Sequence, residues 1–157
     1  MRRVGLAQWQ AHPMFTGVPH TEPEPKMADF PQNYLDLATE KAAYAALATL
    51  MDDGTPQVTP VWFDYTNGII RVNTALGRVK AKNMVVGAPI ALAILDPDNA
   101  YRYVQIRGRV TRTTQDGADE HIEALSHKYL GKPYPFRKPG EERLSVEISI
   151  DKASASG

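Results

Sequence analysis

The chain of 157 residues contains no cysteine, which excludes disulfides, thiol chemistry and cysteine-ligated metals or clusters. No apolar run approaches the roughly 18 residues of a membrane-spanning helix, and the basic start Met-Arg-Arg lacks the apolar region of a secretion signal. Lysine plus arginine and aspartate plus glutamate both number 18, so the overall charge favours neither nucleic acid nor an acidic membrane as a partner. We therefore expect a cytoplasmic protein with one main domain.

The signatures of hydrolysis and phosphoryl transfer are also absent. The sequence has no Gly-x-Ser-x-Gly elbow, no Gly-rich P-loop and no His-Glu-x-x-His helix. His121 and His127 lie six residues apart on a predicted helix, which places them on opposite sides rather than at ligand spacing. We expect both histidines on the surface and no metal site, and we expect the turn carboxylates Asp52, Asp53 and Asp64 to be solvated.

One further absence is local, because no carboxylate occurs between Asp64 and Asp96. This interval contains a strand-like segment (69–73), a turn (74–77) and a helix start that carries Arg78, Lys80 and Lys82. A strand that leads through a turn into a helix directs backbone N–H groups toward one point, and the cations would add to that anion site. We expect Arg78 and Lys80 to converge on an anionic ligand, with Lys82 just beyond; a solvated basic turn is the alternative.

The composition changes near Met27. Residues 1–26 contain four prolines and show no hydrophobic periodicity, so we expect them to be a poorly ordered extension. The folded domain is predicted over residues 27–150, and residues 151–157 are predicted to be a flexible tail. Within the domain a first helix fits residues 31–40, with Pro31 in its first turn.

The remaining periodicity predicts strands joined by tight turns. The segments 42–51, 56–65 and 69–74 are separated by hairpin turns and predict a three-stranded antiparallel meander. A helix follows over 78–86, then strands over 90–95, 101–114 and 144–150. The helix predicted over 116–130 places Ile122, Leu125, Tyr129 and Leu130 inward. Six strands, two or three outer helices and no βαβ alternation indicate a mainly β (α+β) protein, a small antiparallel barrel.

Two groups of side chains are candidates for ligand contact. Gln57, Thr59 and Trp62 lie on a strand beside the basic segment, where alternating polar groups could bind the edge of a flat heterocycle. An ordinary hairpin strand is the alternative. Tyr101 and Tyr103 share one face of their strand, which is more typical of a core or an interface than of stacking on a cofactor.

Four blocks of the sequence resemble, in order, the F420-dependent and FMN-dependent split β-barrel oxidoreductases, relatives of pyridoxamine 5′-phosphate oxidase. The blocks are LATLMDDGTPQVTPVWF, IIRVNTALGRVKAKNM, LDPDNAYRYVQIRGRV and HKYLGKPYPFRKPGEER. The resemblance covers residue 27 to about residue 150, and the subgroup it is most similar to is the one usually assigned the deazaflavin F420. It implies a Greek-key split barrel and a homodimer with a cofactor in each interfacial groove.

The resemblance also implies roles for residues matched by position. The heterocycle would lie along Gln57, Val58, Thr59, Pro60 and Val61, and Asn73 and Thr74 would flank the linker. The phosphate or tail would be held by Arg78 and Lys80, with Val79 between them, and by Asn83. Tyr101 and Tyr103 would reach across from the partner subunit. Lys132, Arg137 and Lys138 are further cations that would suit the longer anion of F420.

The sequence departs from the pyridoxamine phosphate oxidases in one respect, since its C-terminal segment lacks their Arg-x-His substrate signature. Oxidation of vitamin B6 is therefore not expected, and no catalytic side chain is assigned. Alternatives to an F420-dependent oxidoreductase are an FMN-dependent reductase or oxidase of the same fold and a non-catalytic flavin- or tetrapyrrole-binding protein. A nucleic-acid-binding barrel that uses Arg102, Arg107, Arg109 and Arg112 is opposed by the balanced charge.

Overall fold

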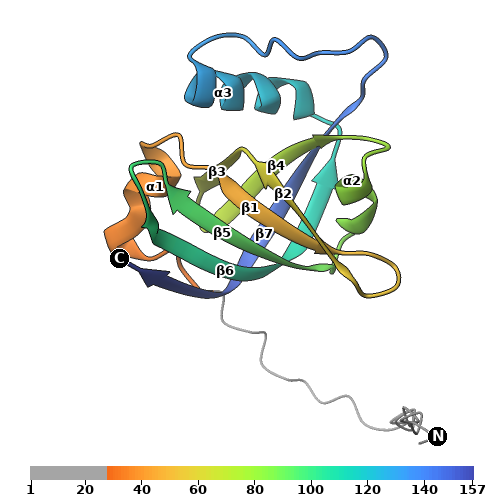
Figure 1. The fold of residues 1–157 in the computed structure, drawn as a ribbon. Helices are drawn as coiled ribbons and strands as arrows, with labels where there is room; N and C mark the ends of the chain where they lie inside the picture. The colour runs from red at the N-terminus through yellow and green to blue at the C-terminus, as the bar shows by residue number, and fades with distance from the viewer. Residues whose placement is uncertain (1–27) are drawn as a thin grey trace, which may run out of the picture.

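Seven antiparallel strands form one curled sheet in the order β2-β1-β5-β6-β7-β4-β3 (Figure 1). The structure is a computed structural model that describes residues 28–157. The strands are β1 (Ala45–Leu50), β2 (Pro56–Val61), β3 (Phe63–Thr66), β4 (Ile69–Ala75), β5 (Pro89–Asp96), β6 (Asn99–Thr114) and β7 (Arg143–Ser156). The helices are α1 (Leu35–Thr39), which follows a 3-10 turn (Gln32–Tyr34), α2 (Val79–Asn83) and α3 (Ala118–Leu130). The predicted split β-barrel class is confirmed.

The curl of the sheet follows from one residue, Trp62. The two edge strands of the sheet are β2 and β3, yet Trp62 alone separates them in the chain. Because β2 pairs with β1 and β3 pairs with β4 at the other edge, the sheet must bend until its edges meet at this residue. The predicted three-stranded meander was therefore wrong at its middle segment, which divides between the two edges.

The turns and the core follow the sequence pattern. Asn67 and Gly68 have φ angles of 52° and 80°, as the predicted two-residue Asn-Gly hairpin requires. Alternate residues of β6 are buried, including Val104, Ile106 and Val110, and they meet the buried face of β7. The interior of the barrel is closed by large apolar side chains that are at most 1% exposed: Leu37, Leu47, Phe63, Ile70, Leu92, Ile94, Ile106, Ile148 and Ile150.

Several predicted boundaries need correction. The sheet has seven strands rather than six, and the last strand continues past Ile150 to Ser156 by pairing with β6, over the residues that were predicted to form a flexible tail. Helix α2 ends at Asn83 rather than near Val86. Leu130, predicted to face inward from α3, is 37% exposed, because it stands at the last turn beside Gly131. The predicted extension over residues 1–26 lies outside the described residues.

Three helices lie around the sheet in Figure 1: α1 beside β5 and β6, α2 at the opposite end of the barrel, and α3 across its upper rim. Helix α3 packs on β4 and β7, and the loop after it returns to the start of β7. In residues 28–157 no helix is long and apolar enough to cross a membrane.

Candidate functional site

A cavity of about 190 Å³ lies where the end of β2, the start of α2, helix α3 and the loop after α3 meet. Five of the residues predicted from the sequence line it together: Pro60, Val61, Asn73, Arg78 and Lys80. The other lining residues are Tyr44, Trp62, Ile122, Tyr134, Phe136 and Arg143. The structure therefore brings the β2 segment and the basic segment to one site, as the sequence predicted.

Lys80 is fixed at the edge of this cavity by a strand residue that was also predicted. Its Nζ donates a hydrogen bond of 2.9 Å to Oγ1 of Thr59. Burial, together with the nearby charges of Arg78 and Arg143, lowers the pKa of Lys80. Within residues 28–157 no carboxylate forms an ion pair with Lys80. A lysine charge in this position is stabilised by an anion from outside.

Arg143 adds a second, deeply placed cation. The side chain is only 3% exposed, and its Nε donates to Oδ1 of Asn73 at 2.8 Å while Nη1 donates to Oε1 of Glu141 at 2.8 Å. The ring of Tyr134 covers the guanidinium at 5.3 Å. Glu141 also lies 3.8 Å from Nη2 of Arg78. Glu141 thus contacts two of the three cations at the cavity, Arg78 and Arg143 but not Lys80, and the remaining positive charge suits an anionic ligand.

The contact between Arg78 and Glu141 corrects a sequence inference. The absence of carboxylates between Asp64 and Asp96 implied that nothing nearby neutralises the basic segment, but Glu141 reaches it from the far end of the chain. Helix α2 has only five residues, so its dipole contributes little and the side chains carry the positive potential. Arg137, expected to join this cluster, instead pairs with Asp119 and Glu123 on α3.

Aromatic side chains line the cavity beside the cations and form one of its walls. Trp62 stacks on Tyr129 with ring centroids 5.2 Å apart and an interplanar angle of 9°, and it meets the ring of Tyr134 edge-on at 6.2 Å. Tyr134 in turn contacts Phe136, which is 60% exposed. The hydroxyl of Tyr129 donates to the carbonyl of Ala43 at 2.6 Å, which holds the stack against the sheet. This wall offers flat apolar surfaces beside the cationic side.

Two of the predicted residues, Gln57 and Asn83, do not line the cavity but form hydrogen bonds close to it. Oγ1 of Thr49 donates to Oε1 of Gln57 at 3.0 Å and accepts from Nδ2 of Asn83 at 3.0 Å. This buried cluster ties α2 to β1 and β2. The amide of Asn83 is thus engaged within the chain, and its role in holding a phosphate stays a prediction.

The remaining predicted residues are spread over the molecule. Thr74 is fully buried, and its Oγ1 has no hydrogen-bond partner among the described residues. Val58 and Val79 are exposed, and Val79 lines a separate cavity together with Lys82 and Asn83. Tyr101 is 85% exposed and Tyr103 half-exposed on β6, and neither lines the cavity of this chain. Their expected reach into a partner subunit stays a prediction.

Four residues of the cavity were not predicted from the sequence: Tyr44, Tyr134, Phe136 and Arg143. The only local signal was the density of aromatic and basic residues in the loop 131–142. It could not distinguish Arg143 from Arg137, because both follow the same Pro-rich segment.

His121 was expected on the surface, but its side chain is buried, with an exposed fraction of 4%. Its Nδ1 lies 2.8 Å from Oγ of Ser145, and its Nε2 lies 3.2 Å from Oδ2 of Asp64. Asp64, expected to be solvated, is bound bidentately by Arg71 at 2.9 and 2.6 Å. Burial acts to raise the pKa of Asp64, but the contacts with His121 and Arg71 outweigh it and the net pKa is lowered. In residues 28–157 no three such side chains gather as metal ligands.

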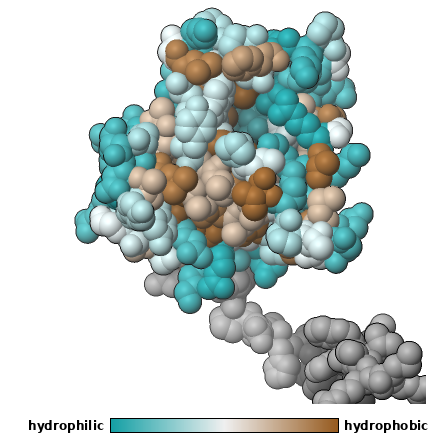
Figure 2. All heavy atoms as spheres, viewed as in Figure 1, coloured by the Kyte–Doolittle hydropathy of each residue, from teal (hydrophilic) through white to brown (hydrophobic). Residues whose placement is uncertain are grey.

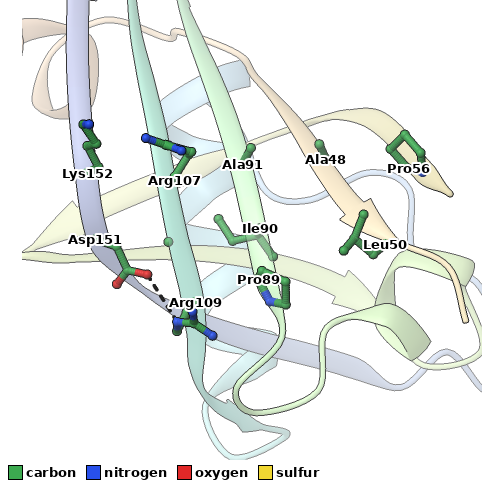
Figure 3. Close-up of a pocket in the computed structure, with 11 residues that line it drawn as sticks. Ala48, Leu50, Pro56, Pro89, Ile90, Ala91, Arg107, Arg109, Asp151 and Lys152 are labelled. Carbon is green, nitrogen blue, oxygen red and sulfur yellow. Dashed lines mark ion pairs between the residues drawn. The ribbon is translucent and has the colours of Figure 1, made fainter. Parts of the chain in front are cut away.

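A second, larger cavity of about 590 Å³ lies on the outer face of the sheet (Figure 3). Its floor is apolar, with Leu50, Pro56 and Ile90, and Figure 3 shows Arg107 and Lys152 along the far side, where Asp151 pairs with Arg109. On the β1–β2 hairpin the outward residues Ala48 and Val58, then Ala46 and Pro60, are cross-strand pairs. They join this cavity to the first one as one apolar strip, and Figure 2 shows apolar side chains gathered on this face.

Comparison with known families gives one match over most of the chain. The family model described as pyridoxamine 5′-phosphate oxidase matches residues 31–156, which include every residue that lines the cavity. The comparison with curated proteins found no match.

Solved structures share the fold. An F420 reductase is 29% identical, with a TM-score of 0.68 over 80% of this chain and 98% of that chain. A FAD and heme binding protein from Mycobacterium smegmatis is 17% identical, with a TM-score of 0.57 over 83% of this chain and 73% of its own. The General Stress Protein 26 from Bacillus anthracis is 12% identical, with a TM-score of 0.57 over 79% and 92% of the two chains. The last two similarities concern the fold alone.

Proposed function

The chain belongs to the pyridoxamine 5′-phosphate oxidase family, and from this premise we propose that it is an oxidoreductase that uses coenzyme F420 for hydride transfer to a small electron-poor substrate. Membership of the family and the similarity to an F420 reductase support a flavin-type oxidoreductase in general terms. The preference for F420, the roles of individual residues and the assembly are our proposal.

The observation that carries the choice of F420 is the excess of positive charge at the cavity. Lys80 is half-buried without a carboxylate partner in the described chain, and the charges of Arg78 and Arg143 help to lower its pKa. A phosphodiester together with a carboxylate-bearing tail, as in F420, would relieve this repulsion at more than one point. FMN brings only one terminal phosphate. Because the cations come from both α2 and β7, they suit the extended anion of F420 better than the single phosphate of FMN.

The aromatic wall would hold the ring system of the cofactor. When bound in its reduced form, F420 would supply the hydride, so this chain's residues need only bind and orient the cofactor and exclude water. Trp62 is locked by its stack on Tyr129, and Tyr134 and Phe136 form a cover that comes from the loop after α3. Such a wall would bind a flat heterocycle and shield the reacting position from solvent.

We also propose that the site is completed by a second copy of the chain. The cavity of about 190 Å³ is smaller than the roughly 300–1,000 Å³ typical of small-molecule sites. The apolar strip of β1 and β2 leads from this cavity to the outer cavity of about 590 Å³, and Val58 on this strip is 61% exposed. A second subunit seated on the strip would bury it and add a wall to the cofactor site.

Titration of the purified protein with F420 and, separately, with FMN tests the cofactor choice. F420 should be retained through desalting with its absorption band, and its affinity should fall as salt rises. Turnover is then assayed by the return of the absorption band of oxidised F420 when reduced F420 passes its hydride to electron-poor acceptors. Tight FMN binding without measurable F420 binding would overturn the choice.

FMN is the second candidate, and one contact favours it. Glu141 pairs with Arg143 at 2.8 Å and lies 3.8 Å from Arg78, and it partly offsets both charges. Lys80 then remains as the cation without a carboxylate partner in the described residues, which matches a single terminal phosphate. Retention of either cofactor without any hydride transfer would instead favour a non-catalytic carrier of a flavin or a tetrapyrrole.

A further inference from the structure

A chain of polar side chains, most of them buried, leads to the cavity and ends on Arg143. It begins at Asp64 on β3, passes through His121 on α3 and reaches Asn73 on β4. His121 and Asn73 are 4% and 9% exposed. Polar groups buried this deeply are retained with defined partners, because an unpaired one is costly. The direction of each hydrogen bond can therefore be followed from residue to residue.

The position of the proton on His121 follows from its neighbours. The carboxylate of Asp64 can only accept, and its Oδ2 lies 3.2 Å from Nε2. This contact is too bent to be a regular hydrogen bond, but the negative charge still favours a proton on Nε2 over a lone pair. Nδ1 is then an acceptor for the hydroxyl of Ser145 at 2.8 Å. Arg71 on β4 is the other charged partner of Asp64.

This tautomer of His121 adds to the contacts that orient the Asn73 amide. Its Nδ2 donates to the carbonyl of Ala118 at 2.8 Å and lies 3.4 Å from Nδ1 of His121. An acceptor at Nδ1 is compatible with the amide N–H₂, whereas a proton there would face it with a second donor. With Nδ2 held on the α3 side, Oδ1 of Asn73 points to Arg143 and accepts from its Nε at 2.8 Å.

We propose that His121 is a positioning residue: with its proton on Nε2 and Nδ1 as an acceptor, it helps to fix the Asn73 amide and thereby holds the Arg143 guanidinium ready for the anionic group of the ligand. The proposal deepens the function proposed above and rests on it for the nature of the ligand. The arrangement of the three side chains is a property of the free protein and can be tested without any ligand.

The first test compares two variants with ligands that have or lack the anion. In His121→Phe the ring remains but both nitrogens are lost, while His121→Asn keeps a carbonyl acceptor near the place of Nδ1. His121→Phe should weaken F420 binding roughly ten- to hundredfold and leave the affinity for the tail-less deazaflavin chromophore unchanged. His121→Asn should stay within about threefold of the parent protein. The matched control is His127→Phe, at an exposed position of the same helix.

The outcomes are decisive in either direction. An equal loss for both ligands in His121→Phe, no loss at all, or an Asn variant no better than the Phe variant would overturn the positioning role. If His121→Phe does not fold, long-range ¹H–¹⁵N correlations of the unaltered protein decide: a proton on Nε2 and a bare Nδ1 support the proposal, and the opposite tautomer refutes it.

Failure of the proposed function would look different. If the unaltered protein binds neither F420 nor FMN, the function is wrong, and the free protein still tests the positioning. The Nε–H resonance of Arg143 should then shift in His121→Phe and return toward its original position in His121→Asn. If the Nε–H resonance of Arg143 does not shift in either variant, His121 does not position Arg143.

Discussion

Nζ of Lys80 lies 2.9 Å from Oγ1 of Thr59, and this hydrogen bond joins helix α2 to strand β2 at the cavity. It links the two stretches of sequence that the resemblance assigned to different parts of one cofactor. Because the hydroxyl of Thr59 is neutral, the bond orients the ammonium without cancelling its charge. The charge stays available for a ligand.

Removal of this charge should weaken cofactor binding. We expect Lys80→Ala to cost roughly 1.5–3 kcal/mol, the range for a hydrogen bond to a charged group, which is about a ten- to hundredfold rise in Kd. The control is Lys82→Ala, since Lys82 is exposed on the same helix and its charge is screened. Isothermal titration with F420 measures both variants. Equal affinities for the two variants would contradict the placement of the anion.

Affinity should also fall at alkaline pH. The pKa of Lys80 is lowered by burial and by the charges of Arg78 and Arg143, so the free protein loses this proton at a lower pH than an ordinary lysine, near 10.4. The anion prefers the protonated form, and affinity is therefore lost as pH rises through the lowered pKa. In Lys80→Arg the guanidinium stays charged, and the affinity of that variant should stay constant over the same range. A parallel decline in both proteins would place the titrating group elsewhere.

Acid should destabilise the protein through Asp96. Hydrogen bonds from Lys41, from the backbone of Asp98 and from Arg102 hold the pKa of Asp96 well below its usual range. The stabilisation is present above the unfolded pKa of about 3.9 and is lost as pH falls through the lower folded value. The Asp96→Asn variant should melt at a lower temperature than the unaltered protein at neutral pH, and its melting temperature should change less as the pH falls. Asp98→Asn is the control, because Asp98 contacts the same lysine at 2.9 Å but is 79% exposed. Similar melting curves for both variants would argue against this assignment.

The proposed dimer can be tested with two equally exposed valines. Val58 on the apolar strip and Val85 after α2 are both 61% exposed. A buried carboxylate without a partner is strongly unfavourable. Val58→Glu should therefore give monomers at micromolar concentration and bind the cofactor more weakly. Val85→Glu is the control and should leave the assembly intact. Sedimentation velocity measures both. A stable monomer of the unaltered protein that still binds cofactor would refute the dimer.

Gly108 should resist any side chain. A Cβ at this position would overlap the carbonyl oxygen of Ser149 on β7, at the point where the register of β6 and β7 shifts. Gly108→Ala should therefore destabilise the protein by about 1–3 kcal/mol, as overpacking does. Gln105→Ala, at an exposed position of the same strand, should change the stability little. Chemical denaturation compares them, and equal midpoints would show that the strands can separate without cost.

The sequence by itself determined the elements that depend on neighbouring residues. The turn at Asn67 and Gly68, the alternation along β6 and the helix start after Arg78 are local patterns, and each was found where the pattern predicted it. The resemblance added the split barrel and brought Pro60, Val61, Asn73, Arg78 and Lys80 to one site.

Contacts between distant residues were decided only by the tertiary structure. Strand-forming residue types continue without a break through Val61, Trp62 and Phe63, so nothing local showed that the chain leaves one edge of the sheet for the other at Trp62. Arg143 rather than Arg137 reaches the cavity because β7 pairs with β4 and sets Arg143 beside Asn73, while Arg137 meets carboxylates of α3. His121 is buried because α3 lies across β4 and β7. A polar residue on a helix has no local signature of what will cover it, since burial is a property of the packed fold.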